Sequence, residues 1–302
     1  MNETLHASAP GKIILCGEYA VVFGHAGIAV PAKQQVEVTY ELGSNDWNLE
    51  WNGLSGDRTK ADAYVHKILD ACPNAKPGIL HIHNTIPLGK GMGSSTALTI
   101  AIARAVGISE REEVLAIENI VNPGNSGIDF AVIWEEKPVY FKKPSPPKVI
   151  ALPPAIIDAL QSAILIDTGA PKETTPELVT WITMRHVQGY KAIEPAIHAI
   201  GGCANRMQTL VTLSPSTSSG QAPVEARQEF ANIIRDHHQA QVNLGVVSTE
   251  AQSLIKKIEQ EGGCAKVIGA GGKTGGSGMV IAFGADPKIA KAMGFKVVEK
   301  RE

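Results

Sequence analysis

The sequence predicts an α+β protein of two domains. Its 302 residues exceed what one hydrophobic core usually organises, so two domains are expected. Short β-branched runs and helical segments both occur on either side of a proline-rich stretch at residues 142–154. Because prolines remove backbone donors and break periodicity, this stretch is interpreted as a linker. The predicted domains are residues 1–155 and 156–302.

The first domain is expected to contain both strands and helices. Two segments, Thr96–Val106 and Glu110–Val121, have the apolar periodicity of helices. Ser109 is the predicted N-cap of the second helix, and Glu112 at N3 would complete a capping box. Short apolar runs bounded by glycine or proline are the expected strands: Ile13–Leu15, Val36–Tyr40, Ile79–His83, Ala131–Ile133 and Pro138–Phe141.

The second domain is predicted to begin with a strand at Ala163–Asp167. A long helical region follows, and the chain then forms a strand pair, Ala265–Ile268 and Met279–Phe283. This order predicts an α+β arrangement. Ser214–Pro223 has almost no apolar side chains, so we expect a mobile surface insertion between helices there, with a phosphorylated regulatory loop as the alternative.

Composition limits the classes of ligand. Hydrophobic residues make up 44% of the chain and charged residues 19%, as in an ordinary folded protein. A net charge of -2 argues against the broad basic surface that nucleic-acid binding requires, so any anion site is expected to be local. The four cysteines lack metal-ligand spacing and are interpreted as reduced core thiols. Without a leader or a long apolar run, we expect a cytoplasmic protein that does not enter membranes.

Three glycine-rich stretches predict a pocket that holds phosphates. They are Pro10–Lys12 with Gly17–Tyr19, then Pro87–Thr96, and finally Gly269–Gly272. Glycine lets backbone N–H groups approach an anion closely. The apolar run from Ala97 indicates a helix whose positive N-terminal end would face that anion. The middle stretch is therefore the predicted phosphate cradle.

Two familiar phosphate motifs do not fit these stretches. A P-loop would need a glycine where Val267 stands, five residues before Gly272. The dinucleotide fingerprint fails at Ser94 in the middle stretch and at Thr274 in the last one, because both positions require glycine. A Rossmann dehydrogenase is disfavoured by this mismatch, although the comparison does not eliminate it.

The motifs instead resemble those of the GHMP kinase superfamily, and within it most closely the mevalonate kinases. The similar segments are Ala9–Gly24, Pro87–Thr96 and Lys266–Gly272, while Glu118 and Asn122–Asp129 resemble the family's magnesium ligand and catalytic aspartate segment. The resemblance covers nearly the whole chain apart from the region near Ser214. It implies a ribosomal-protein-like N-terminal domain and a ferredoxin-like C-terminal domain, an active site in the cleft between them, and often a homodimer.

The resemblance also implies a role for each polar residue. Phosphoryl transfer requires positioning and charge neutralisation. Asp129 would accept or orient the proton of the attacking hydroxyl, with Lys12 as its partner. Ser95 and Glu118 would bind Mg²⁺, a hard ion that prefers oxygen ligands. The expected ATP-binding residues are Pro87, Gly89, Lys90, Gly91, Met92, Gly93, Ser94, Ser95, Thr96, Gly269, Ala270, Gly271 and Gly272, and the expected substrate contacts are Glu18, Tyr19, Lys172 and Thr174.

Each residue also has an ordinary structural interpretation. Lys12 alone would be a solvated lysine, Asp129 a turn residue and Glu118 an exposed helix residue, but their shared context favours function. Ser94 and Ser95 could cap the following helix as well as bind a ligand.

For the remaining residues the ordinary interpretation competes more closely. A β-turn fits Gly269–Gly272, and a surface lysine and a helix N-cap fit Lys172 and Thr174 as well as a substrate role does. His237 and His238 lack a ligand-spaced partner, so surface or capping roles are expected for them.

Three positions depart from the family pattern. Tyr19 stands where mevalonate-using members usually have histidine, a variation that also resembles phosphomevalonate kinases. The order Pro-Gly-Asn-Ser-Gly precedes Asp129, and Lys273–Gly278 replaces a plainer glycine run. The first departure bears on the substrate, the second on the turn before Asp129, and the third on the nucleotide contacts.

The function implied by the resemblance is ATP- and Mg²⁺-dependent phosphorylation of the primary hydroxyl of mevalonate, with Lys172 as a candidate partner for the substrate carboxylate. Alternatives within the fold are a kinase for phosphomevalonate, homoserine or a sugar, and a relative in the decarboxylase branch. The motifs have no added Arg and Lys cluster for a second phosphate, which favours an unphosphorylated substrate. A non-catalytic nucleotide-binding protein and a nicotinamide-dependent oxidoreductase are the alternatives from other classes.

Overall fold

The computed structural model describes residues 4–43, 45–54, 56–213 and 224–298, and the chain forms two compact units. Unit 1 comprises residues 1–13 and 30–137, and unit 2 comprises residues 14–29 and 138–302. Strands β1 (Thr4–Cys16) and β2 (Gly27–Leu42) both pass from one unit into the other. The units are therefore discontinuous in sequence, whereas the expected domains are consecutive. The functional division at residue 155 stays a prediction.

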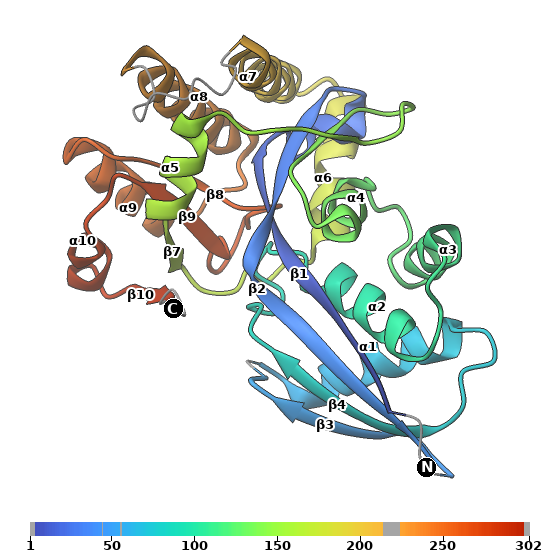
Figure 1. Cartoon of the computed structure of the whole chain (residues 1–302). Helices are drawn as coiled ribbons and strands as arrows, with labels where there is room; N and C mark the ends of the chain where they lie inside the picture. The colour runs from blue at the N-terminus through green and yellow to red at the C-terminus, as the bar shows by residue number, and fades with distance from the viewer. Residues whose placement is uncertain (1–3, 44, 55, 214–223, 299–302) are drawn as a thin grey trace. The chain divides into compact units, whose positions relative to one another are not determined.

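Unit 1 is a sheet with helices packed along one face. The strand β4 (Gly78–Asn84) pairs antiparallel with β2 and parallel with β3 (Asn48–Asn52). Buried residues alternate with polar ones along β2 and β4, because one face of the sheet is covered and the other is open. Figure 1 shows α1 (Arg58–Ala71) and α2 (Ser94–Ala105) on the covered side, and Trp51 Nε1 donates to Asp62 of α1 at 2.7 Å. The helices α3 (Arg111–Val121) and α4 (Ile128–Glu135) complete the unit.

Unit 2 is built around an antiparallel sheet of four strands in the order β10-β7-β9-β8. Its strands are β7 (Ile164–Asp167), β8 (Cys264–Val267), β9 (Met279–Phe283) and β10 (Lys296–Val298). Residues 27–29 of β2 pair with β5 (Val139–Phe141), which pairs in turn with β6 (Lys148–Val149). The helices are η1 (Ala20–Phe23), α5 (Pro154–Ser162), α6 (Thr175–Val187), α7 (Ile193–Leu213), α8 (Val224–Leu244), α9 (Thr249–Gln260) and α10 (Pro287–Ala292).

The α+β class is confirmed, with two sheets, but several local predictions are wrong. The expected strand Ala131–Ile133 lies in α4, where Phe130–Ile133 are all buried, and a short apolar run does not distinguish a buried helix from a strand. The helix α3 starts at Arg111, so Ser109 precedes the N-cap Glu110 and the predicted capping box is not formed. The stretch 142–154 contains β6 and the start of α5, and is more than a linker.

The prediction for the cysteines is confirmed, because all four are buried free thiols. The predicted insertion at Ser214–Pro223 lies outside the described residues. Of the helices that the structure describes, none has both the length and the apolar character that crossing a bilayer requires.

Candidate active site

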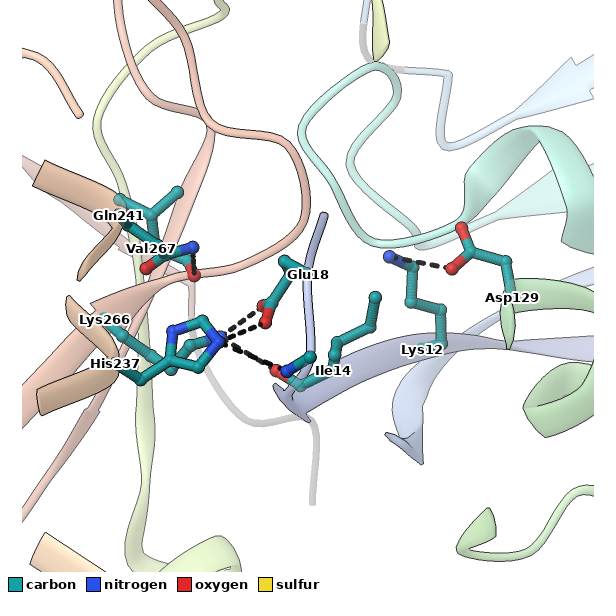
Figure 2. A network of polar contacts seen from close by, with 9 residues as sticks. Lys12, Ile14, Glu18, Asp129, His237, Gln241, Lys266 and Val267 are labelled. Atoms are coloured by element: carbon teal, nitrogen blue, oxygen red, sulfur yellow. Dashed lines mark hydrogen bonds and ion pairs between the residues drawn. The ribbon is translucent and has the colours of Figure 1, made fainter. Parts of the chain in front are cut away.

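Lys12 and Asp129 form an ion pair within unit 1. The Nζ atom of Lys12, on β1, lies 3.1 Å from Oδ1 of Asp129, which is in the first turn of α4 (Figure 2). The Lys12 side chain is 4% exposed and that of Asp129 is 33% exposed. The lysine is therefore held inside the protein, while the carboxylate remains accessible to a ligand. A solvated lysine, the ordinary interpretation of position 12, is excluded.

The middle glycine stretch lies directly against Lys12. The backbone N–H of Lys12 donates to the carbonyl of Met92 at 2.9 Å, which fixes β1 against the stretch. Gly89, Gly91 and Gly93 all have positive φ, between 67° and 85°, a region that side chains rarely adopt. A Cβ atom on Gly93 would lie 2.8 Å from Cγ of Lys12. Glycine at position 93 thus leaves room for the lysine that contacts Asp129.

Replacing Gly93 with alanine is expected to lower kcat by about 10²-fold, because the new methyl group must displace Lys12 from Asp129. Steady-state kinetics of the purified variant measures this. The matched control is Gly107→Ala, which has a similar positive φ of 92° but no neighbour within 4 Å of the added Cβ. Both variants share the backbone strain, about 1–2 kcal/mol. An equal loss of kcat in both would contradict the steric argument.

The N-terminus of α2 follows the glycine stretch immediately. Its N-cap is Gly93, so no side chain caps the first turn. The first backbone N–H groups of a helix have no intrahelical partner and, with the helix dipole, attract anions. Ser94 is buried inside the first turn, whereas Ser95 is half-buried. The capping role considered for the two serines is not observed. Phosphate binding by the first turn stays a prediction.

Glu118 of α3 is a buried carboxylate beside this helix. It is 1% exposed, which excludes the ordinary interpretation of an exposed helix residue. Thr96 Oγ1 donates to Oε1 of Glu118 at 2.8 Å, and Oε2 has no hydrogen-bond partner among the residues that the structure describes. Burial raises the pKa of Glu118 to about 7, and the negative charge of Asp129 adds to this rise. A buried carboxylate oxygen without a donor is suited to a cation.

The side chains of Glu118 and Ser95 are of the chemical type that Mg²⁺ prefers, and magnesium binding by them stays a prediction. Glu118 and Ser95 offer only oxygen atoms, and Mg²⁺ is usually held by one or two carboxylates plus phosphate and water oxygens. The part of the chain that the structure describes contains no group of three or more His, Cys, Asp or Glu arranged as a metal site. Tyr64 of α1 lies close by and accepts a hydrogen bond from Asn122 at 2.8 Å. Burial raises its pKa to about 12.

Glu118→Gln is expected to change how stability depends on pH. Because burial raises the folded pKa from 4.5 to about 7, wild-type folding favours the protonated acid, and stability falls as pH rises from about 4.5 through 7. The amide does not titrate, so the variant should gain on the order of 3 kcal/mol relative to wild type between pH 4.5 and 8. Urea unfolding without Mg²⁺ at several pH values measures the difference. Parallel stability curves would contradict this prediction.

The third glycine stretch lies within unit 2 and packs tightly on its own neighbours. A Cβ atom on Gly271 would lie 2.1 Å from the carbonyl oxygen of Val246, and the N–H of Gly272 donates to that same carbonyl at 2.9 Å. The hydroxyl of Tyr19 donates to the carbonyl of Ala270 at 2.5 Å. The glycines at 271 and 272 are therefore required by close backbone packing.

Glu18 and Tyr19, predicted to contact the substrate, are both buried. Glu18 forms an ion pair with Lys266 of β8, and its Oε2 lies 2.9 Å from Nε2 of His237 of α8 (Figure 2). Burial alone would raise the pKa of Glu18, but Lys266 and the neighbouring His237 lower it to about 2. The surface roles expected for His237 and His238 are wrong, because the two side chains are 0% and 7% exposed. Burial lowers the pKa of both histidines.

Lys172 and Thr174 lie before α6 in unit 2. Thr174 is the N-cap of α6 and forms a capping box with Glu177. Lys172 is exposed, and its backbone N–H donates to the carbonyl of Thr274 at 3.0 Å. Glu173 accepts hydrogen bonds from the backbone of Thr274 and from its hydroxyl. The segment Lys273–Gly278, which departs from the family pattern, is therefore bound to the segment before α6.

A cavity of about 310 Å³ on the open face of the unit 1 sheet contains none of the predicted site residues. It is lined by His6, Glu37, Thr39, Glu50, Trp51, Asn52, His81, Ile82 and His83.

Sequence reasoning missed Lys266 and Tyr64, which contact predicted site residues. A lysine in the buried strand β8, just before a glycine stretch, is a signal that could have identified Lys266. Tyr64 lies on α1, a helix that was not predicted.

Comparison with known proteins finds a family match over the segment that contains Glu118 and Asp129. Residues 61–134 match the family model described as the GHMP kinases N terminal domain. The chain is 25% identical to the mevalonate kinase of Pyrococcus horikoshii over 327 residues, 97% of this chain and 93% of that protein. It is 36% identical to the mevalonate kinase of Methanothermobacter thermautotrophicus over 105 residues, 33% of this chain and 35% of that protein.

Solved structures share the fold over nearly the whole chain. The L. major mevalonate kinase in complex with R-mevalonate superimposes with a TM-score of 0.74 at 17% identity, covering 97% of this chain and 90% of that one. The Streptococcus pneumoniae phosphomevalonate kinase gives a TM-score of 0.70 at 12% identity, covering 97% of this chain and 98% of that one. Residues 61–134 thus match the GHMP kinase family model, and over nearly its whole length the chain is similar to mevalonate kinases and shares their fold.

Proposed function

We propose that the protein phosphorylates the primary hydroxyl of mevalonate with ATP and Mg²⁺, giving 5-phosphomevalonate and ADP. The observation that carries this proposal is the contact of Lys12 with Asp129 beside the glycine stretch that leads into α2. The names of the relatives support mevalonate as the acceptor.

In this proposal Asp129 accepts or orients the proton of the attacking hydroxyl. Its carboxylate is accessible, and the Lys12 ammonium fixes its orientation at 3.1 Å. Lys12 also places a positive charge where negative charge develops during transfer. Because both groups are fixed before the reaction, little reorganisation is needed.

The residues of the middle glycine stretch and the first turn of α2 bind the ATP phosphates through backbone N–H groups. Ser95 and Glu118 would hold Mg²⁺, which when bound would neutralise the negative charge of the phosphates. Deprotonation of Glu118 is coupled to this binding, because the neutral acid is a poor ligand. Gly269–Gly272 is proposed as a further nucleotide contact.

The substrate contacts are proposed as follows. Lys172 is exposed and carries the positive charge that the mevalonate carboxylate requires. Thr174 caps α6 and would contact the substrate from the same segment. Direct contacts by Glu18 and Tyr19 stay predictions, and the buried positions of both side chains favour an indirect role. The expected homodimer and cytoplasmic location also stay predictions.

A coupled assay of ADP release with ATP and mevalonate tests the proposal, with Lys12→Met as the inactive control. Turnover that depends on mevalonate and is absent in the control is the expected result. Phosphomevalonate, homoserine and galactose complete the substrate panel. No ADP release above the control, or faster turnover of another acceptor, would overturn the assignment of mevalonate.

A further inference from the structure

Three ionisable side chains are buried together in unit 2, away from any solvent. Lys266 and His237 are 0% exposed and Glu18 is 3% exposed. Lys266 Nζ contacts Oε1 of Glu18 and donates to the carbonyl of Ile14 at 2.9 Å. His237 Nε2 lies 2.9 Å from Oε2 of Glu18 (Figure 2). We call Glu18, His237 and Lys266 the buried ion cluster.

Stability alone does not explain the buried ion cluster. Removing charges from water is unfavourable, and well-packed apolar residues can often replace a buried ion pair without loss of stability. An ion pair differs from apolar packing because it fixes the relative orientation of the backbone segments that carry it. In the buried ion cluster these segments are the turn after β1 and the strand β8, which enters the third glycine stretch.

One side of the cluster is the turn after β1. Glu18 and Tyr19 belong to this turn, and Tyr19 has φ 65°, a conformation that is unfavourable for a residue with a side chain. Ile14, whose carbonyl binds Lys266, lies just before the turn on β1. Tyr19 also reaches from this turn to the carbonyl of Ala270. A strained conformation of this kind persists only when its surroundings hold it.

The other side of the cluster is the strand that enters the third glycine stretch. Lys266 is on β8, three residues before Gly269. Gln241 of α8, one helical turn after His237, donates to the carbonyl of Val267 at 3.1 Å. With the bond from Tyr19 to Ala270, the glycine stretch is held both before and within its turn. A glycine-rich segment has high conformational freedom unless such contacts restrict it.

We propose that the buried ion cluster is a positioning device: Lys266, with Glu18 and His237, fixes the third glycine stretch in the conformation that contacts the nucleotide. This inference rests on the proposed function, in which Gly269–Gly272 is a nucleotide contact. Backbone N–H groups bind a phosphate well only when their orientation is set in advance. All three side chains are buried, so in this proposal they act on the nucleotide through the glycine stretch.

The test uses the full-length double variant E18Q/K266M, which removes both charges while keeping similar side-chain volumes. It is expected to fold with a melting temperature near that of wild type. Hydrogen exchange measured by mass spectrometry should show faster exchange in the peptide that contains residues 268–272. Calorimetry should show about a tenfold weaker affinity for MgADP.

Two further variants keep the test decisive. Phe230→Ala removes a buried ring of α8 whose centroid lies 5.0 Å from the ring centroid of Phe283. The substitution is expected to destabilise unit 2 without changing a residue of the buried ion cluster. Its exchange at residues 268–272 and its affinity for MgADP should stay as in wild type. Tyr19→Phe removes only the hydroxyl that binds Ala270, and should loosen the same peptide even where the double variant fails to fold.

The inference is overturned if a folded E18Q/K266M protein, or Tyr19→Phe in its place, keeps wild-type exchange at residues 268–272 and wild-type affinity for MgADP. It is also overturned if Phe230→Ala loosens that peptide equally, because the effect would then follow from general instability. The exchange measurement needs neither mevalonate nor turnover. A wild-type protein that binds MgADP but does not phosphorylate mevalonate would refute the proposed function and leave this inference intact.

Discussion

Asp129→Asn is expected to lower kcat by about 10²–10⁴-fold. Asparagine preserves the shape of the side chain but loses the charge, so it cannot accept the proton of the attacking hydroxyl. The change also removes the counter-ion of Lys12, whose side chain is 4% exposed. Stability should therefore fall by about 1–3 kcal/mol, because a buried charge has lost its partner. Steady-state kinetics and urea unfolding of the same preparation separate the two effects.

The double variant Lys12→Met, Asp129→Asn distinguishes catalysis from stability. With both charges removed, stability should return toward wild type, whereas kcat should stay as low as in the single variants because the two residues act as a unit. The control is Glu136→Gln at the end of α4, which breaks an ion pair with Arg104 at 3.2 Å and should leave kcat within about twofold. An Asp129→Asn enzyme that keeps more than about a tenth of wild-type kcat would contradict a proton-accepting role.

The parts of the site that sequence reasoning found are those where residue type alone restricts the structure. Gly89, Gly91 and Gly93 all adopt positive φ, which only glycine adopts without strain. The helix expected after them begins at Ser94, where the glycine stretch ends. Lys12 was predicted to meet Asp129, and the structure brings them together although 116 residues separate them in sequence. This long-range contact was predicted from the resemblance of the two segments to motifs of a known family.

What sequence reasoning missed depends on contacts between distant segments. The surface roles expected for His237 and His238 follow from a local pattern, but His237 is buried because Glu18, more than 200 residues earlier, is its partner. The segment expected as a strand at Ala131–Ile133 lies in the helix α4, and because Phe130–Ile133 are all buried, the apolar run has no periodicity that distinguishes a helix from a strand. The burial of Glu118 could likewise not be predicted from the residues next to it in the sequence. Local patterns predict elements, and tertiary contacts decide which polar groups are enclosed.

Lys266→Met is expected to lower the free energy of unfolding by about 3–5 kcal/mol at pH 7. The substitution leaves the Glu18 carboxylate buried with only His237 beside it, and it removes the donor to the carbonyl of Ile14. In wild type Lys266 and the neighbouring His237 lower the pKa of Glu18 to about 2, so this carboxylate contributes stability above pH 4.5 that is lost as pH falls toward 2. The deficit of the variant should therefore be largest near neutral pH and shrink toward pH 3, as urea unfolding at several pH values would show.

The matched comparison for this prediction is Lys257→Met in α9. Lys257 also pairs with a glutamate, Glu261, at 2.9 Å, but both side chains are about half exposed, so water replaces the lost partner and the change should be below about 1 kcal/mol. The double variant E18Q/K266M should recover most of the stability lost by Lys266→Met, because no uncompensated charge remains buried. Equal losses for Lys266→Met and Lys257→Met, or a deficit that does not depend on pH, would show that Glu18 is not ionised in the folded protein. The ion pair would then have to be described as a neutral hydrogen bond, and the charge argument for the buried ion cluster would fail with it.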